Sequence, residues 1–201
     1  DLVTGVQTCA LPICGADGGT AISTTVNNGG TAQVSAGGAM SNTSVNSGGV
    51  QDVLSGGTAI STTVNDGGTA QVSAGGTMSN TTVNGGGVQN VNYDGTANYT
   101  TVSGSNATQN VNSGGTASII TIDSGSMQVV FDGGSADHTT VATSGGQVVS
   151  GGRVTSTYVE SNAAQHVYGG TVISTTLGES GACQNLSGAV PRESPFPHTD
   201  A

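Results

Sequence analysis

Few residues in this 201-residue chain could act as acids, bases or metal ligands, and their spacing does not bring them together. The sequence holds 12 Asp and Glu, three His and only two basic side chains, Arg153 and Arg192. Hydrolysis of a polysaccharide needs carboxyl groups, or a carboxyl group and a base, that converge on one groove. The aspartates of the repeats stand at different positions of different repeat units, and so do the histidines His138 and His166. We therefore expect no enzyme activity, no catalytic residue, no cofactor and no metal site.

The charge balance and the residues that follow the glycine pairs exclude two further classes of function. The formal net charge is −10 and only 7% of the residues are charged. A nucleic acid is excluded as a partner, because binding to phosphate backbones needs clustered Lys and Arg. A calcium-binding roll needs Gly-Gly-x-Gly-x-Asp in register, whereas Gly-Gly is followed here by Thr-Ala or Val-Gln.

Pairs of glycines divide the chain into repeats. From Gly18 a longer and a shorter spacing between the pairs alternate, which gives a unit of about 19 residues. Counted from the second glycine of every other pair, nine units follow one another, and two positions are aliphatic in all nine. The first column is Val26, Val45, Val64, Val83, Val102, Ile122, Val141, Val159 and Leu177, and the second is Val34, Val53, Val72, Val91, Val111, Val130, Val149, Val167 and Leu186.

The repeat predicts a β-solenoid, although so few hydrophobic residues would otherwise suggest disorder. Each unit holds two β-prone runs, such as 20–26 and 31–36, separated by Gly-rich corners. If each unit coils once and stacks on the last, the aliphatic columns become interior ladders and the backbone pairs between rungs. We therefore predict an all-β fold, a single-stranded parallel β-helix of about nine rungs of about 19 residues.

Two polar columns accompany the aliphatic ones. Asn27, Asn46, Asn65 and Asn84 follow the first column, where we expect Asn in a left-handed corner with stacked side-chain amides. Every unit also has a glutamine near its second column, and its position shifts by one residue between units, so that one strict ladder is not required. These glutamines are Gln33, Gln51, Gln71, Gln89, Gln109, Gln128, Gln147, Gln165 and Gln184.

Both ends of the chain depart from the repeat. Residues 3–13 resemble a translated sequencing adapter, and we expect 1–14 to be a non-native segment, 15–188 the solenoid domain and 189–201 an off-pattern tail. Prolines at positions 191, 195 and 197 make the tail unsuitable for another rung. Of Cys9, Cys14 and Cys183 only Cys183 lies inside the repeats, so we expect no internal disulfide.

The unit also resembles a known family of repeats. Gly-Gly-Thr-Ala-Ile-Ser-Thr-Thr-Val-Asn occurs at 18–27 and again at 56–65. It resembles the repeat of AIDA-type autotransporter adhesin passengers, over Gly18 to about Gly188. The resemblance implies a passenger displayed outside the cell at the bacterial outer membrane, with membrane contact only through a C-terminal β-barrel that is absent from this sequence. Some relatives carry heptose added by a glycosyltransferase, which makes six hydroxyl side chains candidate glycan acceptors: Ser23, Thr24, Thr25, Ser61, Thr62 and Thr63.

The function that this resemblance implies is adhesion to a host-cell surface or self-association between copies, without catalysis. A passive spacer that presents a distal domain is the alternative. A polysaccharide-degrading β-helix is disfavoured by the missing site residues. An ice-binding solenoid is disfavoured because the outward row four and six residues after the glycine mixes Ser23 and Thr25 with Tyr99 and Ile119.

Overall fold

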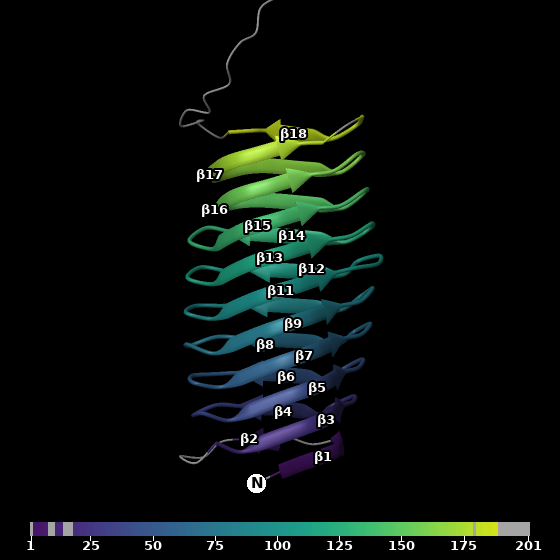
Figure 1. Cartoon of the computed structure of the whole chain (residues 1–201), viewed down its shortest axis with the longest axis vertical. Helices are drawn as coiled ribbons and strands as arrows, with labels where there is room; N and C mark the ends of the chain where they lie inside the picture. Colours follow the sequence, from purple (N-terminus) through teal and green to yellow (C-terminus); the bar gives the residue numbers. More distant parts are fainter. Residues whose placement is uncertain (1, 8–10, 14–17, 179, 189–201) are drawn as a thin grey trace, which may run out of the picture.

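The computed structural model describes residues 2–7, 11–13, 18–178 and 180–188, which form a stack of parallel β-strands (Figure 1). The tail that we predict at 189–201 lies outside the described residues, as do Cys9 and Cys14. Within the predicted repeat domain the strands of the first five rungs are β3 Thr20–Val26, β4 Thr31–Val34, β5 Ala39–Val45, β6 Val50–Val53, β7 Thr58–Val64, β8 Thr69–Val72, β9 Thr77–Val83, β10 Val88–Val91, β11 Thr96–Val102 and β12 Thr108–Val111. The remaining strands are β13 Thr116–Ile122, β14 Met127–Phe131, β15 Ser135–Val141, β16 Gly146–Val159, β17 Ala164–Leu177 and β18 Cys183–Leu186.

Up to β15 each rung contributes a seven-residue strand and a four- or five-residue strand, which pair with the equivalent strands of the next rung. Ala59 of β7 lies opposite Met78 of β9, and Val53 of β6 lies opposite Val72 of β8, so that each residue meets its equivalent in the next unit. Every strand pairing is parallel, and Figure 1 shows the strands rising as one continuous coil. The predicted all-β solenoid of about nine rungs is thus confirmed.

The segment that resembles an adapter forms two further strands, β1 Leu2–Gln7 and β2 Leu11–Ile13. They pair in parallel with β3 and β4, and the β1 pairing is irregular between Val3 and Gly5. The boundary at residue 14 stays a prediction.

The seven-residue strands bend in the middle. In all nine rungs the fourth residue after the glycine has a left-handed backbone, with φ between 51° and 59°. These residues are Ser23, Asn42, Ser61, Asn80, Tyr99, Ile119, His138, Ser156 and Ser174. The bend shifts the side-chain alternation by one residue, so that positions two, five and seven of the unit all face the core. A straight strand could not place Met40, Thr43 and Val45 on one side.

The corners explain why glycine comes in pairs. Gly67 has a φ of 68°, which L-residues with a side chain rarely adopt. Gly68 has no positive φ, but a Cβ there would lie 2.4 Å from the carbonyl oxygen of Val45 in the rung below. The first glycine therefore turns the chain, and the second lets adjacent rungs approach at strand spacing.

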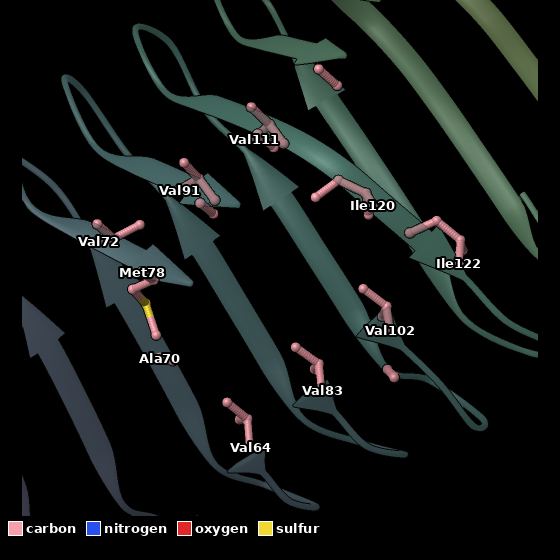
Figure 2. Close-up of a cluster of buried hydrophobic side chains, with 14 of the residues drawn as sticks. Val64, Ala70, Val72, Met78, Val83, Val91, Val102, Val111, Ile120 and Ile122 are labelled. Carbon is pink, nitrogen blue, oxygen red and sulfur yellow. The ribbon is translucent and has the colours of Figure 1, made fainter. Parts of the chain in front are cut away.

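The two aliphatic columns form the core (Figure 2). Every member from Val26 to Val159 and from Val34 to Val167 is at most 1% exposed. Leu177 and Leu186 differ, because they are 46% and 52% exposed. The prediction that they are core residues is wrong for this structure, since no described strand lies above them.

The later rungs lose one of their corners. The units that begin at Gly134 and Gly152 are one residue shorter than the repeat. There the chain runs on as a single 14-residue strand, first β16 and then β17, with register shifts where the corner would be. The shortened corner is absorbed as a bulge, and the rungs above and below keep their pairing.

Candidate interaction surface

The six candidate glycan acceptors divide by the direction of their side chains. Thr24 and Thr62 are each 1% exposed and face the core, because they occupy position five of their units. Ser23, Thr25, Ser61 and Thr63 lie on the outer face, partly or fully exposed. The folded solenoid therefore offers four of these six hydroxyl groups to a modifying enzyme.

Position five forms an internal column of hydroxyl groups. Thr62 donates a hydrogen bond to Gln51 Oε1 at 3.0 Å, and Thr100 does the same to Gln89 Oε1 at 3.2 Å. Thr43 and Thr81 have no partner for their buried Oγ1 atoms. The amino acid 11 residues earlier is alanine for both of them (Ala32 and Ala70), where Thr62 and Thr100 have a glutamine.

The glutamines form a buried ladder in the upper part of the stack. From Gln109 to Gln184 each side-chain amide donates to the Oε1 of the glutamine below, at 2.6–2.8 Å, and Gln89 is the lowest acceptor. Gln51 is equally buried but stands alone, since Ala32 and Ala70 occupy the same place in the neighbouring rungs. The expectation that the column need not be strict is therefore confirmed only for the lower rungs.

Residue size alternates between rungs where the ladder is interrupted. Met40 and Gln51 fill one rung, Ala59 and Ala70 the next, and Met78 and Gln89 the one after. Large and small layers interlock in this way at native packing density. Gln33 and Gln71 stand one residue later than Gln51, so that they face outward and leave the interior to alanine.

The asparagine column forms amide stacks, as predicted, but not at left-handed corners. Nδ2 of Asn46, Asn65 and Asn84 donates to the Oδ1 of the asparagine 19 residues earlier at 2.8–2.9 Å. None of the four has a positive φ. The left-handed residue of each corner is the glycine two positions later, as in Asn65-Asp66-Gly67. The asparagine carbonyl accepts the hydrogen bond that closes the turn, for example from Gly68 N to Asn65 O at 2.8 Å.

Charged groups on the outer faces of the described residues form no larger cluster. Partial burial raises the pKa of Asp52, and the hydrogen bond from Gln71 opposes this shift. The hydrogen bond from Thr155 lowers the pKa of Asp137, with His138 Nδ1 acting in the same direction from 2.7 Å. No group of three or more His, Cys, Asp or Glu suited to a metal ion occurs among the described residues.

One hollow on the outer surface was missed by the sequence reasoning. It is a shallow groove of about 310 Å³ over the bends of three successive rungs, lined by Asn80, Thr81, Thr82, Tyr99, Thr100, Thr101, Ile119 and Thr121. Its lining includes the left-handed residues at position four and the outward residues at position six of these rungs. A flat Thr-x-Thr array, as an ice-binding face requires, is therefore not formed at these rungs.

Comparison with known proteins places the fold in a family. The crystal structure of a TibC-catalysed, hyper-glycosylated TibA fragment matches with a TM-score of 0.76 and 32% sequence identity, over 94% of this chain and 77% of that one. A family model described as an adhesin of the bacterial autotransporter system, probable stalk, matches residues 36–87. The chain belongs to the AIDA-type autotransporter adhesins. None of the curated proteins matches it.

For an AIDA-type adhesin, the columns now have a structural meaning. The interior columns hold the rungs of the passenger together, and the outer columns are the surface available to a partner. The family implies display on the cell surface. The described residues contain no helix long and apolar enough to cross a membrane.

Proposed function

We propose that this passenger segment mediates bacterial self-association or attachment to a host cell through its outer columns, without catalysis, while displayed outside the outer membrane. The observation that carries the proposal is the repetition of neutral polar side chains on the outer faces. Thr63, Thr82 and Thr101 follow one another at position six, and Gln71, Asn90 and Asn110 follow one another on the shorter strands.

Such columns suit many weak contacts along a long surface. Neighbouring rungs lie ~4.8 Å apart, so that each column presents a hydrogen-bonding group at every step. Individually these contacts are weak, but they act together when two rods align, since the second contact is formed at high effective concentration. The low charge of the faces reduces repulsion between copies.

Settling of displaying bacteria tests this function. Residues 15–188 are anchored on the surface of a non-clumping strain, and clumping and binding to cultured host cells are measured. A variant with Thr63→Glu, Thr82→Glu and Thr101→Glu is compared with one carrying Gln71→Glu, Asn90→Glu and Asn110→Glu, because the two add the same charge to different faces. We expect one face to be far more sensitive; absence of clumping and host binding in the unmodified protein would contradict the proposal.

A passive stalk is the second candidate, and the family description as a probable stalk favours it. The uniform stack of rungs suits a rod that holds another domain away from the cell (Figure 1). The two candidates differ in the settling experiment, because a stalk displayed alone produces no clumping.

A glycosyltransferase that acts on Ser and Thr is part of the proposal. Support comes from the hyper-glycosylated state of the TibA fragment and from the outward position of Ser23, Thr25, Ser61 and Thr63. Peptide mapping by mass spectrometry after co-expression with such an enzyme is expected to find hexose- or heptose-sized additions at these four residues. If modification follows folding, Thr24 and Thr62 stay unmodified, because their hydroxyl groups are buried.

A further inference from the structure

Two residues break the pattern of the bends. Tyr99 and Ile119 occupy the left-handed position four, where six other rungs have Ser or Asn and one has His. A β-branched residue is strained in this backbone conformation, because its Cβ substituents crowd the following carbonyl group. Both side chains are also largely in solvent, Tyr99 at 56% and Ile119 at 46% exposure, so that core packing does not account for them. Strain without a packing benefit indicates a functional position.

The same two residues stand in consecutive rungs beside the groove. Tyr99 and Ile119 line it from the left-handed position four, and Thr82, Thr101 and Thr121 line it from position six. Asn80 adds an exposed amide at its lower end. The groove therefore combines one aromatic ring, one aliphatic side chain and a row of neutral hydrogen-bonding groups, and no charged side chain lines it.

We propose that this groove binds a neutral saccharide chain. A pyranose ring has an apolar face of C–H groups and an equatorial set of hydroxyl groups. The ring of Tyr99 and the side chain of Ile119 would cover the apolar face, in the way that aromatic side chains serve amphipathic ligands. The threonine hydroxyl groups and the Asn80 amide would donate to and accept from the sugar hydroxyls.

The backbone argues against an extended peptide as the ligand. Peptides that bind as an added strand pair with an unpaired strand edge. Here Thr100 and Thr101 of β11 are paired on both sides, with Thr81 and Thr82 of β9 and with Ile120 and Thr121 of β13. At these residues the strand therefore has no open edge to which a peptide could add. An anionic sugar is disfavoured because the groove has no cation to neutralise it, within a chain of net charge −10.

The inference deepens the adhesive role proposed above by giving its ligand a chemical class. The test uses the full chain and saturation-transfer NMR with a defined panel: cellotetraose, maltotetraose, tetra-N-acetylchitotetraose and lacto-N-tetraose, with a sialylated oligosaccharide and an extended peptide as comparisons. We expect at least one neutral oligosaccharide to bind. Tyr99→Ser should weaken that binding at least tenfold, because it removes the aromatic ring that would cover the sugar. The bend should be kept, because serine occupies position four in other rungs.

Tyr93→Ser is the matched control. Tyr93 is 75% exposed at a corner, outside the groove, and Ser113 holds the equivalent place in the next rung. Its replacement should leave saccharide binding unchanged. Equal losses in Tyr99→Ser and Tyr93→Ser would overturn the proposal, as would binding of the peptide alone or of no neutral saccharide.

Ile119→Asn separates a binding role from a structural one. Ile60→Asn is the control, because Ile60 is similarly exposed but has no positive φ. Asparagine occupies position four in two other rungs, so Ile119→Asn should unfold at a higher temperature than Ile60→Asn. It should also lose saccharide binding, whereas Ile60→Asn should not. Unchanged saccharide binding in Ile119→Asn would overturn the site. If the unmodified protein binds saccharide but causes neither clumping nor host-cell binding, only the adhesive function is contradicted.

Discussion

The glutamine ladder should make the upper rungs far more sensitive to the loss of one amide than the lower rungs. Gln128→Met keeps an unbranched side chain of similar volume at a fully buried position. In the native protein the Gln128 amide donates to Gln109 at 2.7 Å and accepts from Gln147 at 2.6 Å and from Thr139 at 3.4 Å. Methionine replaces none of these bonds.

The cost follows from the partners left behind. Three buried polar groups lose a partner, and each such loss costs about 1–3 kcal/mol. Allowing for the more favourable burial of methionine, we expect a net destabilisation of about 3 kcal/mol. Gln51→Met is the control, since Gln51 is as buried but accepts only from Thr62 and makes one weak contact with Met40. There the expected cost is about 1 kcal/mol or less.

Both variants are measured by guanidinium unfolding followed by circular dichroism, with hydrogen exchange at the two sites as a local readout. The local readout is needed because repeat arrays can unfold in parts rather than in one step. A cost in Gln51→Met as large as that in Gln128→Met would refute the reasoning, because it would mean that the ladder bonds add nothing to burial.

Three further outcomes are expected. Thr81→Val should stabilise the protein by about 1 kcal/mol in thermal unfolding because it removes an unpartnered buried hydroxyl group, whereas Thr100→Val, which removes a real hydrogen bond, should cost about as much. Gly68→Ala should destabilise more than Gly146→Ala, since its Cβ would lie 2.4 Å from the Val45 carbonyl oxygen, whereas the nearest atom to a Cβ at Gly146 is 3.9 Å away and neither glycine has a positive φ; similar unfolding midpoints would contradict the close-approach account. Burial raises the pKa of Asp52, so the folded state gains stability relative to the unfolded state as pH falls through that raised pKa. Asp52→Asn should therefore stabilise the protein by less than about 1 kcal/mol at neutral pH and lose this advantage in acid. Unfolding curves measured at several pH values check this.

The rung and its core could be predicted from the sequence because they depend on strict repetition. A valine that returns at the same place in every unit has to occupy the same place in each coil, and Val64 and Val83 indeed lie in adjacent strands (Figure 2). The exposure of Leu177 and Leu186 was not predictable in this way, since it depends on what lies above the last described rung.

Which glutamines face inward could have been predicted from the sequence by comparing their positions within the short strands. The strand Val50–Val53 has glutamine at its second position and Thr69–Val72 has alanine there. Because alternate residues of a strand face opposite sides, this difference of one residue sends Gln51 inward and Gln71 outward. The column looked irregular only while inward and outward glutamines were counted together.

The bend at position four gave a much weaker signal. Seven-residue β-prone runs without glycine suggest a straight strand, and Ser23 or Asn42 in the middle is compatible with either conformation. Tyr99 and Ile119 argue against a left-handed residue on propensity alone. The groove follows from the bend, so it could not be found before the bend was known.

Interior and exterior positions of this solenoid are therefore constrained differently. An inward residue contacts its equivalents in the rungs above and below, so a change in one rung requires a compensating change in the next, as the alternation of Met40 with Ala59 illustrates. An outward residue can change without a compensating change in the next rung, so neither a regular nor an irregular outward column is required by packing. A departure that costs backbone strain, as at Ile119, is therefore more informative about function than the regular columns around it. The columns show how the rod is built, and its irregular outward residues are where specific recognition should be sought.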